Sequence, residues 1–100
     1  MSETKIIATV KEYERDKIYR LNRRLDGLYE LLETIDNTKI NFGNPDKMRK
    51  DIKEDIVDCK NRIQKWWNII GEKYNLPEGE NFSVIFASGD IIESYILYNY

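Results

Sequence analysis

Two long stretches of the chain carry apolar residues at every third or fourth position. The first covers about residues 13–36, and its apolar members are Ile18, Leu21, Leu25, Leu28, Leu32 and Ile35. The second covers residues 45–74, and its members are Met48, Ile52, Ile56, Cys59, Ile63, Trp66, Ile70 and Tyr74. Residues three and four apart line one face of an α-helix, so the pattern predicts two amphipathic helices.

The segment between the two stretches, residues 37–44, is rich in turn-forming residues and predicts a loop. Asn37, Asn41 and Gly43 favour turns. Asn44 is well placed to cap the second helix, and Pro45 suits a first helical position because its missing N–H is not needed there. Pro77 prevents the second helix from continuing past about residue 74.

The two stripes predict an antiparallel helical hairpin, packed in the manner of a coiled coil, in a single register. The residue numbers of facing positions sum to 84 in five pairs: Leu32 with Ile52, Leu28 with Ile56, Leu25 with Cys59, Leu21 with Ile63 and Ile18 with Trp66. Charge favours the same pairing. The end of the first helix is acidic and the start of the second is basic, with Asp26, Glu30, Glu33 and Asp36 against Lys47, Arg49, Lys50 and Lys53.

The start of the first helix admits two interpretations. Thr9 and Glu12 have the spacing of a capping box, which would leave residues 5–8 extended and available as a short strand. Alternatively, the helix begins near Glu3, or by about residue 10. The β-branched residues of this segment favour neither choice decisively.

The C-terminal segment changes to β-prone sequence and predicts a β-hairpin over residues 81–98. Its strands are 81–86 and 91–98, with a turn at Ala87–Asp90. Both strands carry apolar residues on both faces, which is unusual for the edge of a monomeric sheet. We therefore expect one face to meet the helices and the other to be covered by another element or chain. The fold class is α+β, in a single domain of residues 1–100.

Composition narrows the function classes. The 100 residues are 41% hydrophobic and 34% charged, with a net charge of −2, one cysteine and no histidine. These counts exclude most metal sites, thiol–imidazole pairs and Ser–His–Asp triads within one chain. No apolar run approaches a membrane span, and the N-terminus lacks the apolar stretch of a signal peptide. We expect a cytoplasmic protein that does not associate with membranes.

The candidate chemical groups indicate no enzyme. Cys59 lies on the apolar stripe and is expected to be a buried structural thiol. The carboxylate pairs Glu54 with Asp58 and Asp51 with Asp55 are expected on a solvated face. No phosphate-binding loop, nucleophile elbow or metal-ligand spacing is present in the sequence. We predict no catalytic residue, no metal site and no cofactor.

Two sets of residues are candidates for binding. Trp67, Tyr95, Tyr98 and Tyr100 predict an aromatic surface for a protein partner, and the β-prone tail predicts a homo-oligomer. The alternative is a basic helix face that binds nucleic acid or a small nucleotide through Tyr13, Lys17, Arg20 and Arg24. Bases of the second helix lie at the matching level of the hairpin: Lys60, Arg62 and Lys65.

One segment resembles a known group of proteins. Residues 62–77, Arg62-Ile-Gln-Lys-Trp-Trp-Asn-Ile-Ile-Gly-Glu-Lys-Tyr-Asn-Leu-Pro77, resemble the second helix of many small proteins of bacteriophages and prophages. In these, a polar helix ends in a W-x-x-I-x-x-K-Y-x-L-like turn before a short β segment. The resemblance covers about a fifth of the chain. It implies a phage or mobile-element accessory protein that binds and blocks a host protein, such as a defence component, and it assigns no functional residue.

Overall fold

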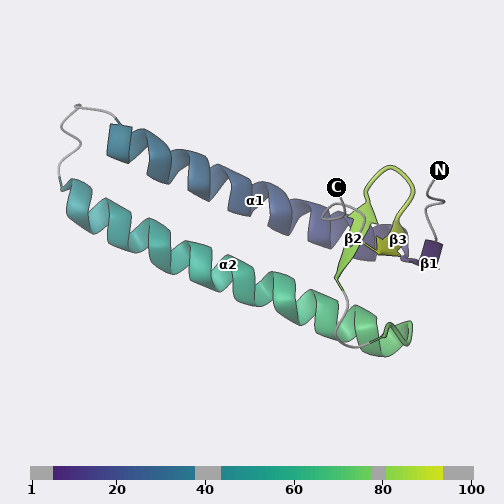
Figure 1. Cartoon of the computed structure of the whole chain (residues 1–100). Helices are drawn as coiled ribbons and strands as arrows, with labels where there is room; N and C mark the ends of the chain where they lie inside the picture. Colours follow the sequence, from purple (N-terminus) through teal and green to yellow (C-terminus); the bar gives the residue numbers. More distant parts are fainter. Residues whose placement is uncertain (1–5, 38–43, 78–80, 94–100) are drawn as a thin grey trace, which may run out of the picture. The chain divides into compact units, whose positions relative to one another are not determined.

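The protein has the predicted α+β fold. The structure, a computed structural model, describes residues 6–37, 44–77 and 81–93. Its elements are, in chain order, β1 (Ile6–Thr9), α1 (Glu12–Asn37), α2 (Pro45–Lys73), β2 (Phe82–Ile85) and β3 (Asp90–Glu93), as Figure 1 shows. The chain divides into two compact units. The first unit comprises Met1–Tyr19 and Trp66–Tyr100, and the second comprises Arg20–Lys65.

The second unit is an antiparallel pair of helical segments held by one apolar stripe (Figure 1). Its core consists of Ile35, Ile52 and Ile56, which come from both helices. Half-buried apolar residues pack against this core: Leu25, Leu28, Leu32 and Met48. These are the residues that the helical spacing selected, so the predicted hairpin is confirmed. Gly27 has open space where a Cβ would stand, so it makes no close packing contact.

The predicted meeting of acidic and basic helix ends is seen at Arg49. Its Nε donates to Asp36 Oδ1 at 2.6 Å, across the two helices, and its Nη1 donates to Asp46 Oδ1 at 3.0 Å. Both carboxylates are at least half exposed, at 52% and 92%, so each pair adds little to stability on its own. The cross-helix pair contributes mainly by favouring this register over others.

The ends of α2 follow the sequence prediction to within one residue. Asn44 caps its N-terminus, because the Lys47 N–H donates to Asn44 Oδ1 at 3.2 Å. At the other end Asn75 adopts a left-handed backbone with φ of 54°. The Leu76 N–H then donates to the Gly71 carbonyl at 2.9 Å, which closes the helix in a Schellman motif.

The predicted capping box at Thr9 is wrong. The residue that reaches back is Glu14, whose Oε1 accepts the Lys11 N–H at 2.9 Å, so Lys11 occupies the N-cap position of a helix that begins at Glu12. Thr9 instead ends β1, and its hydroxyl donates to Asp90 Oδ1 at 2.7 Å. Of the two interpretations of this segment, the extended one is confirmed for residues 6–9.

The first unit contains a three-stranded antiparallel sheet in the order β1-β3-β2. The N-terminal segment is therefore recruited to the hairpin, and β3 becomes the central strand. The short N-terminal strand that the extended interpretation of residues 5–8 made available is therefore present. Ile91 is fully buried on one face of the sheet, whereas Ile92, on the other face, is half-buried.

The hairpin turn lies one residue earlier than predicted. Ile85 pairs with Asp90, so the turn consists of residues 86–89. Gly89 has a φ of 78°, which favours glycine, and a Cβ there would stand 3.1 Å from the Val10 carbonyl oxygen. The Gly89 N–H donates to the Ile85 carbonyl at 2.7 Å. Residues 94–98 of the predicted second strand lie outside the described residues.

Candidate functional site

The outer face of the sheet exposes isoleucines. Ile6 in β1 lies opposite Ile92 in β3, and Ser83 in β2 lies opposite Ile92 on its other side. The next row on the same face consists of Thr9, Asp90 and Ile85, with Thr9 three residues after Ile6 because of the register shift in β1. Ile6 is 55% exposed and Ile85 is 38% exposed. The face therefore combines exposed isoleucines with the polar side chains of Ser83, Thr9 and Asp90, and the exposed isoleucines are candidates for contact with a partner.

The opposite face of the sheet is packed inside the first unit. Its central row is Ala8, Ile91 and Val84, which pair across the three strands. Ile91 is fully buried, whereas Ala8 and Val84 are half-buried. Because successive residues of a strand point to opposite faces, burial of Ile91 directs Ile92 and its row to the outer face. The exposed isoleucines therefore lie on a sheet whose opposite face is buried.

Both edges of this sheet are short. β1 and β2 each have four residues, and each pairs only with β3 among the residues that the structure describes. A register shift between Ile6 and Ala8 interrupts the ladder on the β1 side. Unpaired strand edges can add a strand from another chain, and bulges limit this. In the described part, β2 is therefore the more regular edge.

A buried carboxylate joins the helix ends of the first unit. Glu14 is 5% exposed. Its Oε2 accepts from Lys73 Nζ at 2.8 Å, and its Oε1 accepts from the Tyr74 hydroxyl at 2.6 Å. Its backbone carbonyl accepts from Trp66 Nε1 at 3.1 Å. Together with the Lys11 cap, these bonds fasten the start of α1 to the end of α2.

The charge states of this cluster are those of a structural contact. Burial raises the pKa of Glu14, but hydrogen bonds from Lys73, Tyr74 and Lys11 outweigh it and leave the pKa below its ordinary value. The hydrogen bond to Glu14 raises the pKa of Lys73 well above its usual range, and it also raises the pKa of Tyr74. Near neutral pH each group keeps one protonation state, which does not suit proton transfer.

Trp67 is half-buried and lies beside Trp66. The two indole rings meet edge to face, with centroids 4.9 Å apart and planes at 90°. Trp66, which the sequence placed in the core, is 5% exposed. Part of Trp67 therefore remains accessible. The other predicted partner-binding residues, Tyr95, Tyr98 and Tyr100, lie outside the described residues.

The predicted basic residues are exposed. Tyr13 and Lys17 belong to the first unit, and Tyr13 is 65% exposed with Lys73 Nζ 5.7 Å from its ring centroid. Arg20 and Arg24 belong to the second unit and are also exposed. Across residues 6–37, 44–77 and 81–93, no ion pair engages Lys17, Arg20 or Arg24.

The bases of α2 are more engaged. Arg62 Nε pairs with Asp58 Oδ2 at 3.0 Å, one helical turn away. Lys60 Nζ stands 5.6 Å from the ring centroid of Tyr29, across the hairpin of the second unit. Lys65 is exposed. Arg62 and Lys60 are therefore weaker candidates for phosphate contacts than the arginines of α1.

The remaining candidate groups are a buried thiol and exposed carboxylates. Cys59 is 1% exposed, and its thiol donates to the Leu21 carbonyl at 3.3 Å, as expected for a structural thiol. The four acids of the predicted pairs on α2 are all exposed. Among the described residues, no cluster of three or more His, Cys, Asp or Glu side chains could hold a metal ion. No described helix is long and apolar enough to cross a membrane.

Three important residues were not singled out from the sequence. Ile6 and Ile85 are exposed only because of strand pairings that no local pattern specifies. For Glu14, in contrast, the sequence pattern does indicate a buried position. It lies one turn before Ile18 on the apolar stripe, where a buried carboxylate requires partners. Lys73 and Tyr74 at the far end of the hairpin are the partners that the antiparallel register brings to it.

Comparisons with known proteins do not identify the chain. No protein-family model matches it, and searches of curated proteins and of solved structures found no significant match. Its function must therefore be inferred from its own residues.

Proposed function

We propose that this protein is a small non-enzymatic module that binds another protein and acts by occupying its surface. The observation that carries the proposal is the outer sheet face, where Ile6 and Ile85 are exposed on either side of the central strand. A sheet with a buried inner face offers a surface that needs little ordering on binding. The half-buried Trp67 is a further candidate for contact, as are Tyr95, Tyr98 and Tyr100.

The proposed partner is a host protein in the cytoplasm. The resemblance of residues 62–77 to phage and prophage accessory proteins supports an origin in a phage or mobile element. Such proteins often block a host component, including components of defence. Steric inhibition fits a chain with no histidine and one cysteine, because it requires shape and apolar contact rather than reactive groups.

The test is a comparison of partner binding by matched full-length variants. The native chain, an Ile6→Lys/Ile85→Lys double variant and an Arg20→Glu/Arg24→Glu double variant are each immobilised and exposed to host extract. We expect the native chain and the arginine variant to retain the same stoichiometric protein. The isoleucine variant should lose it, with affinity reduced by at least about 100-fold because two charges would be desolvated at the contact.

Circular dichroism controls for folding, since both substituted isoleucines are exposed. Retention of the partner by a folded isoleucine variant would refute the proposed face. Absence of any stoichiometric partner for the native chain would refute the proposed function. Deletion of residues 91–100 is a poorer test, because it removes most of the central strand and the buried Ile91.

A second candidate function is phosphate binding by the basic residues of α1. It is supported by the exposure of Lys17, Arg20 and Arg24 and by the absence of ion pairs to them in the described part. This function predicts binding of single- or double-stranded oligonucleotides that weakens steeply with salt. Measured by fluorescence anisotropy, the Arg20→Glu/Arg24→Glu variant should lose that binding. Undiminished binding would exclude these arginines.

A further inference from the structure

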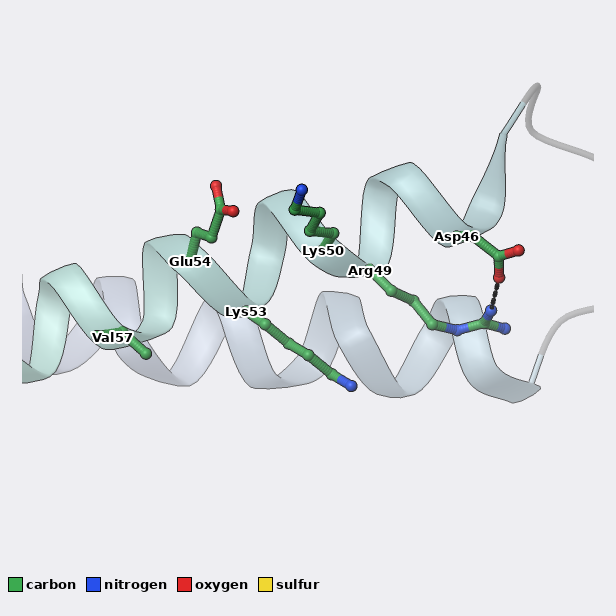
Figure 2. Close-up of a pocket in the computed structure, with 6 residues that line it drawn as sticks. All are labelled: Asp46, Arg49, Lys50, Lys53, Glu54 and Val57. Carbon is green, nitrogen blue, oxygen red and sulfur yellow. Dashed lines mark hydrogen bonds and ion pairs between the residues drawn. The ribbon is translucent and has the colours of Figure 1, made fainter.

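The second unit has a base-rich groove along α2. Six residues line it: Asp46, Arg49, Lys50, Lys53, Glu54 and Val57. Figure 2 shows Lys50 and Glu54 projecting to one side of the helix and Arg49 and Lys53 to the other. Val57 lies at the end away from Asp46 and is 58% exposed, which is high for an apolar residue in mid-helix.

The lysines of this groove lack acidic partners within the described part of the chain. Arg49 is already paired with Asp36 and Asp46, whereas no ion pair engages Lys50 or Lys53 among the described residues. Glu54 follows Lys50 by four residues, so its carboxylate lies one helical turn from Lys50 on the same side of α2. The lining still has an excess of bases, three against two acids.

The same unit carries the complementary charge on α1. Asp26, Glu30 and Glu33 recur at positions i, i+4 and i+7, so they lie along one side of the helix. All three are exposed and form no ion pair with other described residues. Glu30 and Glu33 also line a shallow hollow with Thr34 and Asn37. We call these three acids the acidic row.

The acidic row and the groove lie at the same level of the hairpin. Leu28 and Leu32, which alternate with the acidic row on α1, pack on the cluster that contains Ile52 and Ile56. On α2, Ile52 lies between Lys50 and Lys53 in the sequence, and Ile56 follows Lys53 by three residues. Equal level is what a two-fold axis parallel to the helices requires if Glu30 and Glu33 of one copy are to meet Lys53 and Lys50 of another. The reverse contact forms at the same time, as an isologous interface requires.

We propose that the occupant of the α2 groove is the acidic row of a second copy of this chain. In this dimer two helical pairs associate through reciprocal acid–base contacts. The aliphatic parts of the facing glutamates cover Val57. Because the contacts are between exposed charges, the dimer forms at low ionic strength and weakens as salt screens it. This interface is separate from the sheet face of the proposed function and does not depend on it.

A charge-exchange experiment tests this proposal with the full-length chain. Light scattering is used to measure the mass of the native chain, of Lys50→Glu/Lys53→Glu, of Glu30→Lys/Glu33→Lys, and of an equimolar mixture of the two variants. The native chain should be a dimer at low salt. The self-association of each variant alone should be at least about 100-fold weaker than that of the native chain, because like charges would face each other. The mixture should recover the dimer, since each variant then supplies what the other lacks.

The controls separate this interface from folding and from the sheet. All four substituted residues are exposed, and circular dichroism verifies the helices. Ile6→Lys/Ile85→Lys should leave the mass unchanged. A native chain that stays monomeric at low salt overturns the proposal, as do variants that dimerise like the native chain. Failure of the mixture to associate, or dissociation caused by the isoleucine variant, also overturns it.

Discussion

The two compact units are stabilised in different ways. The first has side chains removed almost completely from solvent, with Ile18 and Ile91 at 0% exposure and Ile70 at 1%. It also encloses a satisfied polar cluster around Glu14. In the second, the main apolar cluster of Ile35, Ile52 and Ile56 remains 6–7% exposed, and only the small side chain of Cys59 is more buried. Two helices can shield only one stripe, whereas helix ends and a sheet can enclose a core.

We infer from this difference that the two units have different roles. The first can present a firm surface, since its sheet is backed by buried residues and its helix ends are joined by Glu14. In the second unit, charged side chains are exposed along helices whose apolar core is only partly shielded from solvent. We expect this unit to gain stability when these side chains are covered, which agrees with the proposed dimer. The predictions below compare matched positions in the two units.

The largest difference should appear in the apolar cores. Ile18→Ala in the first unit should lower the free energy of unfolding by about 4 kcal/mol, because a fully enclosed site cannot collapse around the cavity. Ile52→Ala in the second unit should cost about 2 kcal/mol, since solvent and flexible neighbours can fill the space. Urea unfolding of the two variants measures both values. Equal losses would remove the distinction between the units.

The next difference concerns carboxylates. Glu14→Gln in the first unit should destabilise the protein by about 2 kcal/mol, because it weakens hydrogen bonds to a buried charge. The exposed Glu33 in the second unit provides a matched control, and Glu33→Gln should change stability by less than about 0.5 kcal/mol. A comparable effect of the two substitutions in urea unfolding would show that the Glu14 cluster is not a structural contact.

The pH dependence of stability gives an independent test of Glu14. Its pKa in the folded protein lies below its ordinary value of 4.5. Its contribution is therefore fully present above that value and is lost as pH falls through the lower pKa of the folded state. Urea midpoints measured from pH 7 to pH 3 should fall more steeply at the acid end for the native chain than for Glu14→Gln. Parallel curves would contradict the assignment.

Glycines provide a smaller contrast of opposite sign. Gly89→Ala in the first unit should destabilise by about 1–2 kcal/mol, because its φ of 78° is unfavourable for other residues and the new Cβ would crowd the Val10 carbonyl. Gly27→Ala in the second unit should stabilise by about 0.5–1 kcal/mol, since the position is open and helical. Thermal unfolding followed by circular dichroism distinguishes the two signs. Destabilisation by Gly27→Ala would indicate a contact that the open position does not provide.

The smallest expected effect is that of the cross-helix ion pair of the second unit. Asp36→Asn removes the partner of Arg49 and should cost about 0.5 kcal/mol, because the carboxylate is 52% exposed and Arg49 retains Asp46. The measurement is urea unfolding at low and high salt, where the difference from the native chain should shrink as salt rises. A loss as large as that of Glu14→Gln would mean that exposed pairs dominate this unit.

The helices were predictable from the sequence because their signals are local and repeated. A stripe such as Leu25, Leu28 and Leu32 and a stop such as Pro77 specify a helix without knowledge of the fold. The sheet depended on distant partners. Nothing near β3 indicates that β1, more than 80 residues earlier, pairs with it and makes it the central strand. The candidate site shares this dependence, since the exposure of Ile6 and Ile85 follows from the pairing.

A site-specific photo-crosslinking experiment tests the central claim most directly. A photoreactive amino acid is placed at Ile85 in one full-length chain and at Val57 in another, and each is irradiated in host cells. The account predicts that position 85 crosslinks to one foreign protein, whereas position 57 does not crosslink to that protein. No protein adduct at position 85, or a foreign-protein adduct formed equally at both positions, would contradict it.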